Sequence, residues 1–265
     1  MKHNNNYPLV FIRGLLRSQA HWGKFKSMIM TTFPDRQCLF LNIPGNGELC
    51  HLTSPCHIRQ MTLALITQLT ELNLTTNKVD LVSISMGGMI ALDWANYKPS
   101  QINSLVLINT SLKNFSPFYQ RLQPKSWWLL LTMLLRSQRQ KEEKIYQLTS
   151  NYSAKNNQTS QQEINQHREQ TINQWLILAK QQPVKISNGL KQLFAAANFK
   201  LVKKPLIPIT LINSRNDQLV GAVCSEQLAK AWHVELITHS WAGHDIALDD
   251  PLWLCQKLQE KSQYN

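Results

Sequence analysis

Ser85 lies in the segment Ser83-Ile84-Ser85-Met86-Gly87-Gly88, between an apolar strand-like run and a helix-like stretch. So sharp a strand-to-helix turn leaves room only for small side chains at the residues two before and two after the serine. Here those residues are Ser83 and Gly87, and both are small. Such a turn raises the serine hydroxyl at the carboxyl edge of a sheet and points the N-terminus of the next helix toward it. The pattern indicates a nucleophile, although an ordinary strand end followed by a flexible turn has the same residues.

An acidic residue and a histidine follow two later strand-like runs. Asp217 lies in a polar loop after the run 206–212, and His244 follows Gly243 in the loop after the run 234–238. The chain order Ser, Asp, His distinguishes one class of serine hydrolases from the others. We therefore predict that Ser85 attacks a substrate, that His244 takes and returns the proton, and that Asp217 orients the imidazole ring.

An attack of this kind needs hydrogen-bond donors for the oxyanion that forms. We predict the backbone N–H of Met86, directly after the nucleophile, as one donor. The second is expected from the loop Arg13-Gly14-Leu15-Leu16, which follows the first strand-like run. Its candidate donor is the N–H of Leu15, and because both donors are backbone groups, their side chains can be apolar.

These segments resemble the α/β-hydrolase superfamily, in its bacterial carboxylesterase-like group with a helical cap. The resemblance rests on the Gly14 loop, Ile43-Pro44-Gly45-Asn46-Gly47, the turn at Ser85, Asn216-Asp217 and Gly243-His244. The family commonly has His where this chain has Arg13, and Gly where it has Ser83. The first difference bears on the pocket wall and the oxyanion loop, and the second bears on strain in the turn.

Apolar runs alternate with helical stretches along most of the chain. Strand-like runs occur at 8–12, 37–43, 79–83, 104–109, 206–212 and 234–238, and helical stretches occur at 19–32, 57–72, 87–97, 222–232 and 251–262. This alternation predicts an α/β fold with about six strands, all parallel, and helices on both faces of the sheet. Only seven residues precede the first run, so we expect no antiparallel pair to open the sheet.

Residues 112–204 contain helical stretches but no convincing strand, and they lie where the α/β-hydrolase scheme inserts a cap. We predict a core made of residues 1–111 and 205–265, and a helical cap made of residues 112–204. The apolar run 127–135 in this cap is too short to cross a bilayer, which needs about 20 residues. We expect it to pack over an acyl pocket.

The positive charge of the chain is concentrated in the predicted cap. The formal net charge is +12, and residues 112–204 hold 15 Lys and Arg against four Glu. Either these side chains form an ordinary solvated surface, or they attract an anion: an acidic carrier protein, an anionic lipid surface or a charged small ester. Nucleic acid is not expected as a partner, because no nucleic-acid-binding module is recognisable.

Two Cys-His pairs lie close together in the sequence and could in principle bind a metal ion. Cys50-His51 and Cys56-His57 offer four potential zinc ligands, but their spacing matches no standard site, so we expect no metal. The five cysteines lack the spacing of a disulfide framework, and the first residues lack the apolar core of a signal peptide. Both features favour a cytoplasmic protein with reduced thiols.

Four further polar residues lie near the predicted site in the sequence. His21 is interpreted as a surface histidine of the first helix or as part of the pocket wall. Asp245, Asp249 and Asp250 flank His244, and we interpret them as caps of the final helix, which begins near Pro251.

The sequence therefore predicts a serine hydrolase that cleaves a small-molecule carboxylic ester or thioester with a hydrophobic acyl part. The route passes through an acyl-enzyme and needs no cofactor. The same fold also supports C–C bond hydrolysis, lactone opening and acyl transfer. A non-catalytic binding protein is the alternative from another class, and no transmembrane segment is expected.

Overall fold

The computed structural model describes residues 7–72, 78–127, 136–155 and 159–262. A six-stranded sheet has the order β2-β1-β3-β4-β5-β6, and every pair of neighbouring strands is parallel. The strands are β1 (Leu9–Ile12), β2 (Cys38–Leu41), β3 (Val79–Ile84), β4 (Ile102–Ile108), β5 (Ile209–Ser214) and β6 (Leu236–His239). The predicted α/β fold with a parallel six-stranded sheet is confirmed.

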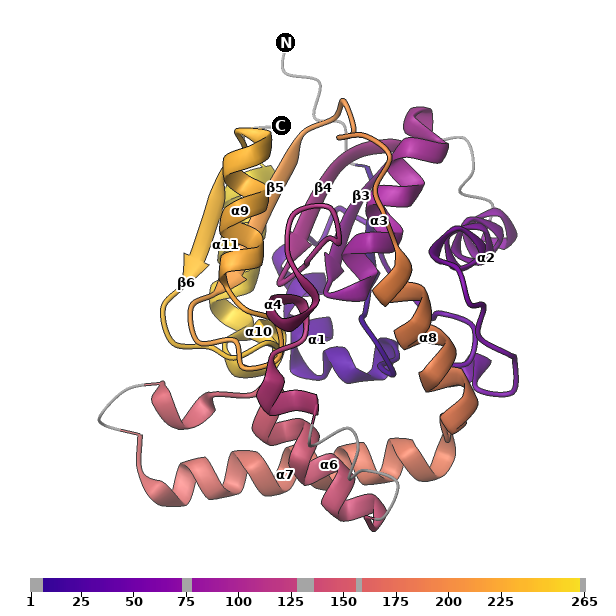
Figure 1. Cartoon of the computed structure of the whole chain (residues 1–265). Coiled ribbons are helices and arrows are strands. Elements are labelled where there is room, and N and C mark those ends of the chain that lie inside the picture. Colours follow the sequence, from indigo (N-terminus) through magenta and orange to yellow (C-terminus); the bar gives the residue numbers. More distant parts are fainter. Residues whose placement is uncertain (1–6, 73–77, 128–135, 156–158, 263–265) are drawn as a thin grey trace.

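Helices cover both faces of the sheet (Figure 1). One face carries the 3₁₀ helix η1 (Gln19–Trp22), α1 (Lys24–Thr32), α10 (Ile246–Asp249) and α11 (Pro251–Ser262). The other carries α2 (Ile58–Glu71), α3 (Met86–Tyr97) and α9 (Val223–Trp232). The predicted helices of the core are present. The first is divided at Gly23, whose positive φ of 51° breaks the helical path between η1 and α1.

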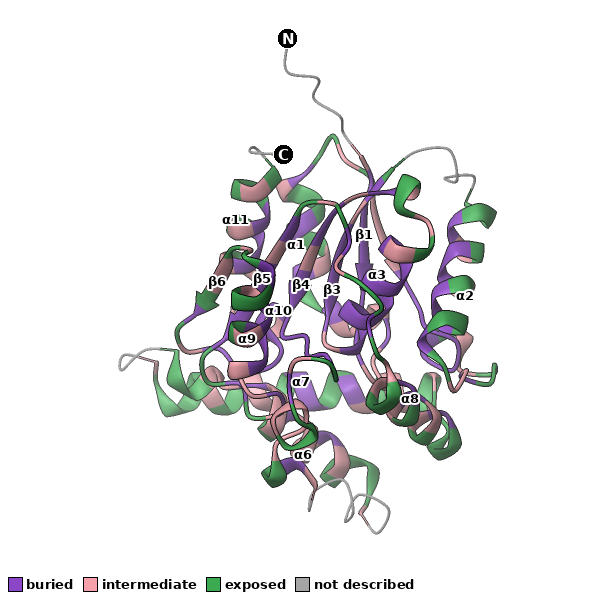
Figure 2. Cartoon of the chain, turned by 45° about the horizontal axis from the view of Figure 1, so that its top comes forward, coloured by how far each residue is buried: buried purple, intermediate pink, exposed green. Residues whose placement is uncertain are grey.

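Side chains of each strand alternate between the two layers of helices. In β1, Val10 and Ile12 pack toward α2 and α3, whereas Leu9 and Phe11 pack toward α1 and α11. All four are buried, as are most strand residues (Figure 2). Burial on both faces explains why the strands read as continuous apolar runs in the sequence.

Between β4 and β5 the chain forms further helices at the carboxyl edge of the sheet (Figure 1). They are α4 (Phe118–Arg121), α6 (Gln138–Thr149), α7 (Gln161–Gln181) and α8 (Ile186–Asn198), called here the inserted helices. Capping boxes at Ser137 and Ser160 begin α6 and α7. The described residues of this segment contain no strand, in agreement with the sequence, while its division from the core at residues 112 and 204 stays a prediction.

The apolar run predicted to cover the pocket, 127–135, lies outside the described residues except for Trp127. In the part of the chain that the structure describes, no helix is long and apolar enough to cross a membrane.

Candidate active site

Ser85 forms the turn between β3 and α3. Its backbone has φ 58° and ψ −123°, a left-handed conformation that is strained for a residue with a side chain. Neighbouring backbone lies very close, since a Cβ atom on Gly87 would be 2.6 Å from the carbonyl oxygen of Ile12. A Cβ atom on Gly88 would be only 2.1 Å from Oγ1 of Thr110. The two glycines therefore allow the turn to fit against β1 and the end of β4.

Ser83 occupies the position where relatives commonly have glycine. It is fully buried, and its Oγ donates a hydrogen bond to the carbonyl oxygen of Val106 at 3.3 Å. The larger side chain is thus accommodated by the neighbouring strand β4, and the turn keeps its form.

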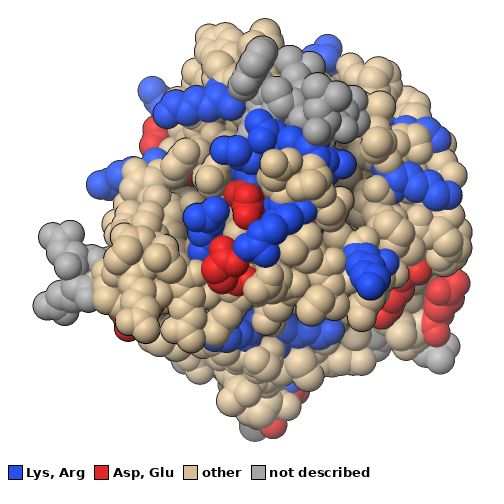
Figure 3. Space-filling model, turned by 90° about the horizontal axis from the view of Figure 1, so that it is seen from below, with Lys and Arg blue, Asp and Glu red and all other residues tan. Residues whose placement is uncertain are grey.

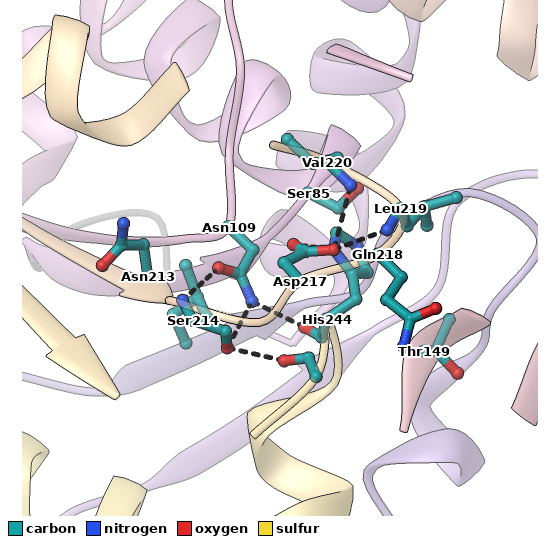
Figure 4. Close-up of polar contacts among 12 residues, drawn as sticks. Ser85, Asn109, Thr149, Asn213, Ser214, Asp217, Gln218, Leu219, Val220 and His244 are labelled. Carbon is teal, nitrogen blue, oxygen red and sulfur yellow. Dashed lines mark hydrogen bonds and ion pairs between the residues drawn. The ribbon is translucent and has the colours of Figure 1, made fainter. Parts of the chain in front are cut away.

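His244 and Asp217 are directly paired. The distance from His244 Nδ1 to Asp217 Oδ2 is 2.6 Å, and only 7% of the histidine side chain and 1% of the aspartate side chain are exposed. The N–H groups of Leu219 and Val220 donate to Asp217 Oδ1 at 2.8 and 2.9 Å (Figure 4). Because Oδ1 is held by two backbone donors, the orientation of the carboxylate is fixed with Oδ2 toward the ring.

Asn109, the first residue after β4, holds the backbone of the histidine loop. It has a left-handed φ of 48°, which asparagine tolerates better than most residues. Its amide donates to the carbonyl oxygen of His244 at 2.7 Å, and Ser214 donates from its hydroxyl to the carbonyl of Gly243 (Figure 4). Asn109 and Ser214 are not among the predicted residues, although the signal is present, because each lies at the carboxyl end of a strand.

Ser85 and His244 line one cavity of about 390 Å³, together with Leu15 and Met86. Asp217 lies directly behind the imidazole, so the five predicted site residues are brought to one place. Among the described residues, no hydrogen bond joins the Ser85 hydroxyl to the His244 ring, and such contacts are often long before a substrate binds. Most of the remaining lining is apolar, and it includes Met89, Phe118, Leu122, Trp127, Ile145, Leu148, Leu193 and Val220.

The loop after β1 approaches the nucleophile closely at Gly14. A Cβ atom there would lie 2.9 Å from Cβ of Ser85, so a side chain at this position would displace the loop or the serine. The N–H of Leu16 donates to Gln192 of α8 at 2.9 Å. The N–H of Leu15, in contrast, has no acceptor among the described residues and is free to bind a substrate oxygen.

Comparisons with known proteins agree with this fold. Residues 46–251 match the model of a hydrolase family described as serine aminopeptidase, S33. The chain belongs to this family. It is thus an α/β-hydrolase, as the sequence predicts, and no curated protein sequence is similar enough to count as a match.

Solved structures of other α/β-hydrolases are similar in fold. A thermophilic esterase from Thermogutta terrifontis is 16% identical, with a TM-score of 0.71 over 97% of this chain and 90% of that one. A putative aryl esterase from Burkholderia cenocepacia is 16% identical, with a TM-score of 0.70 over 98% and 91%. A putative non-heme bromoperoxidase from Mycobacterium tuberculosis is 16% identical, with a TM-score of 0.69 over 96% and 91%. At such identities the likeness establishes the fold alone.

Arg13, which stands where other α/β-hydrolases commonly have histidine, forms a buried ion pair with Asp245. Its two terminal nitrogens donate to the two carboxylate oxygens at 3.0 and 2.6 Å, and the exposed fractions of the Arg13 and Asp245 side chains are 4% and 3%. Burial alone would raise the pKa of Asp245, but the Arg13 guanidinium holds that pKa below its usual value. The prediction that Asp245 caps the final helix is wrong. Its carboxylate binds Arg13 instead, and so links the loop after β1 to the loop that carries His244.

Asp249 also differs from its predicted role. Its carboxylate accepts hydrogen bonds from the Ser150 hydroxyl and from the N–H groups of Asn151 and Gly243. These bonds tie the end of α6 to the histidine loop of the α/β-hydrolase core. The capping prediction is right for Asp250 alone, whose Oδ1 accepts from the N–H of Trp253 in the first turn of α11.

We expect Asp245→Asn to lower the free energy of unfolding by about 3–5 kcal/mol, because Arg13 keeps a buried charge without its partner. The matched control is Glu260→Gln, which removes an exposed ion pair with Lys257 and should cost within about 1 kcal/mol. Urea unfolding followed by circular dichroism measures both values. Similar small losses in the two variants would contradict the role given to the buried pair.

The stability of this α/β-hydrolase should also depend on the protonation of Asp249. Burial raises its pKa from 3.8 to about 6, although three donors face the carboxylate. A folded pKa above the unfolded one means that the folded state binds the proton more tightly, so the contribution of this group to stability grows as pH falls from about 6 to about 4. Relative to Asp249→Asn, the wild-type free energy of unfolding should rise across that window by up to about 3 kcal/mol. Urea titrations at pH 7, 5 and 4 test this, and a difference that does not change with pH would contradict it.

His21 lies outside the cavity of Ser85. It lines a second cavity of about 360 Å³ between η1 and α7, together with His167 and Trp175. Burial lowers the pKa of His21 well below its usual value of 6.5, so the ring is neutral at physiological pH. The residue is therefore neither a fully exposed histidine nor a wall of the candidate active site.

The Cys-His pairs gain no further support as a metal site. Cys50 and Cys56 are free thiols, each half-buried. The described residues contain no group of three or more His, Cys, Asp or Glu placed to hold a metal ion.

Proposed function

We propose that this α/β-hydrolase cleaves a carboxylic ester or thioester with a hydrophobic acyl part, through an acyl-enzyme on Ser85. The observation that carries the proposal is the buried His244–Asp217 pair, whose histidine lines a largely apolar cavity together with a serine on a strained turn. Imidazole beside a serine hydroxyl, with its other nitrogen held by a carboxylate, is the arrangement that nucleophilic acyl transfer requires.

In the proposed reaction, Ser85 Oγ attacks the carbonyl carbon while His244 Nε2 takes the hydroxyl proton. Asp217 holds Nδ1 and stabilises the imidazolium, and the N–H groups of Leu15 and Met86 donate to the oxyanion. The imidazolium then gives its proton to the leaving alcohol or thiol. A water molecule repeats the sequence on the acyl-enzyme, releasing a carboxylic acid and restoring the serine.

The lining of the cavity favours an apolar acyl group over the free amino terminus of a peptide. Among the described residues that line it, Asp245 carries the one carboxylate, and Arg13 already neutralises that group. An ammonium group would therefore be desolvated there without a free anionic partner, which is unfavourable. This argument separates the proposal from the aminopeptidase activity that the family description names.

A serine-directed fluorophosphonate probe tests the proposal. We expect the wild type to be labelled, peptide mapping to place the label on Ser85, and Ser85→Ala to remove it. Ser111 lines the same cavity, so Ser111→Ala is the matched control and should still be labelled. A folded wild type that takes no label would favour the non-catalytic binding protein.

Substrate assays then separate the reactions that this fold supports. We expect hydrolysis of p-nitrophenyl esters, with kcat/KM rising with acyl length, and no comparable hydrolysis of aminoacyl p-nitroanilides. Faster acyl transfer to an added alcohol than to water would favour the acyltransferase, and activity on lactones or C–C substrates alone would favour those alternatives. The free cysteines suit a reducing compartment, so a cytoplasmic location is part of the proposal.

A further inference from the structure

Helix α8 presents three large apolar side chains to solvent, while two polar amide side chains of the same helix are buried. Ile186, Leu190 and Phe194 are four residues apart on one side of the helix, and their exposed fractions are 60%, 63% and 55%. The opposite side carries Asn188 and Gln192, which are 1% and 0% exposed. A surface helix of a globular protein usually has its large apolar side chains turned toward the core, so these three exposed side chains are unusual.

The buried polar side chains show that this orientation of α8 is specific. Asn188 accepts from the N–H of Ser54 and donates to the carbonyl of Leu52, both at 3.0 Å. Gln192 accepts from the N–H of Leu16 and donates to Asn46 and to the Ser54 hydroxyl, at 2.8 to 2.9 Å. Because each amide oxygen and nitrogen of these two side chains has a hydrogen-bond partner, rotating α8 to bury its apolar side would break the bonds and leave polar groups unsatisfied.

Helix α4 adds two exposed aromatic side chains beside α8. Phe118 and Tyr119 are 66% and 50% exposed. Arg121, one turn later, donates to the carbonyl oxygens of Ala196 at 2.6 Å and Ala197 at 3.3 Å, which fixes α4 against the end of α8. We call the five exposed side chains the apolar rim: Phe118, Tyr119, Ile186, Leu190 and Phe194.

The apolar rim adjoins the candidate active site. Phe118 and Arg121 of α4 line the cavity that contains Ser85, and so do Leu193 and Ala196 of α8. A surface that bound the rim would therefore contact the same two helices that form one wall of the cavity.

The two stretches of sequence that contain α4 and α8 carry basic side chains and no acidic ones. Residues 94–141, which include α4, contain seven Lys and Arg and no Asp or Glu. Residues 170–216, which include α8, likewise contain seven basic residues and no acidic one. Lys113, Lys125 and Lys185, which are close to rim residues in the sequence, are exposed, and basic side chains outnumber the acidic ones on the lower side of the molecule (Figure 3).

We propose that the apolar rim docks the protein on an anionic lipid surface, from which the cavity takes an amphiphilic ester. Helices with Phe and Leu on one side and Lys at the edges lie in the plane of the membrane interface, with the lysines among anionic headgroups. An acidic protein would complement the lysines, but the five exposed apolar side chains match a lipid surface better. The source of the ester rests on the proposed hydrolase function, whereas the docking does not.

Vesicle flotation with the Ser85→Ala variant tests docking without any catalysis. We expect binding to vesicles of equal parts phosphatidylcholine and phosphatidylglycerol, and little binding to phosphatidylcholine alone. Leu190→Gln and Phe194→Gln, neither of which lines the cavity, should each weaken binding about tenfold. The matched control is Ile177→Gln on α7, equally exposed at 56% but outside the rim, and it should bind as the parent does.

Activity provides the second measurement, in the otherwise wild-type protein. Leu190→Gln should hydrolyse a water-soluble p-nitrophenyl ester at the parental rate but lose about tenfold on an ester embedded in anionic vesicles. Absence of vesicle binding, or equal loss in Ile177→Gln, would overturn the docking proposal. Binding of an acidic carrier protein that Leu190→Gln abolishes, without vesicle binding, would also overturn it and assign the rim to a protein. Vesicle binding by an unmutated protein that hydrolyses none of the esters tested would overturn the proposed function alone.

Discussion

Replacing His244 by alanine is expected to lower kcat for ester hydrolysis by about 10⁶-fold, the loss seen when a nucleophile is deprived of its base. The Ser85 hydroxyl would then have no group to take its proton, since Asp217 lies behind the ring and faces two backbone donors. KM should change little, because the imidazole contributes little to the apolar lining. Initial rates with a p-nitrophenyl ester, at enzyme concentrations set by active-site titration of the wild type, measure both constants.

Two controls make this result specific to the base. His21→Ala removes a neutral histidine from the neighbouring cavity and should leave kcat within a few-fold of the wild type. Added imidazole should partly restore the activity of His244→Ala, because the deleted ring faces an open cavity. If His244→Ala kept a tenth or more of the wild-type kcat, another group would have to act as base, and the proposed mechanism would be wrong.

The sheet and the position of the site were predictable because both depend on local patterns. Strands buried on both faces must be continuously apolar, and all parallel strands end at the same edge. Polar residues just beyond those ends, such as Ser85, Asp217 and His244, therefore converge whatever the details of the packing. The same rule applied to Asn109 would also have placed that residue at the site.

The roles of Asp245 and Asp249 were not predictable from local patterns. Helix-capping rules compare a residue with its neighbours three or four positions away. Asp245 instead pairs with Arg13, which is 232 residues away in sequence, and Asp249 bonds Ser150 and Asn151 of the inserted segment. The fold brings these distant partners close to the two carboxylates. Each carboxylate therefore forms buried hydrogen bonds with them, and the helix-capping rule does not describe its contacts.

The exposure of the apolar rim could not be predicted from the sequence for a different reason. Ile186, Leu190 and Phe194 have the spacing of a buried helix face, and a pattern of this kind is ordinarily assigned to the core. Only the paired amides of Asn188 and Gln192 reveal that the polar side of α8 is the buried one. Hydrophobic periodicity predicts that a helix has an apolar face and a polar face. It does not predict that hydrogen bonds to the polar face will bury that face instead of the apolar one.

The second large effect is expected for Asp217→Asn, which should lower kcat by about 10⁴-fold. The structure gives the reason. The N–H groups of Leu219 and Val220 must still meet an acceptor, so the amide oxygen will face them and the amide nitrogen will face His244. The ring must then accept at Nδ1 and carry its proton on Nε2. That tautomer cannot take the proton of Ser85.

A control variant at a neighbouring residue distinguishes the effect of the histidine tautomer on kcat from that of a general loss of structure. Asn216→Ala changes an exposed side chain that donates to the carbonyl of Ser240 at 3.3 Å, and it should leave kcat within a few-fold of the wild type. Nitrogen NMR of the imidazole in Asp217→Asn should show the proton on Nε2, whereas the wild type should carry it on Nδ1. A proton that stays on Nδ1, or a kcat within tenfold of the wild type, would mean that a group other than Asp217 orients the ring, and Asp245 would be the next carboxylate to test.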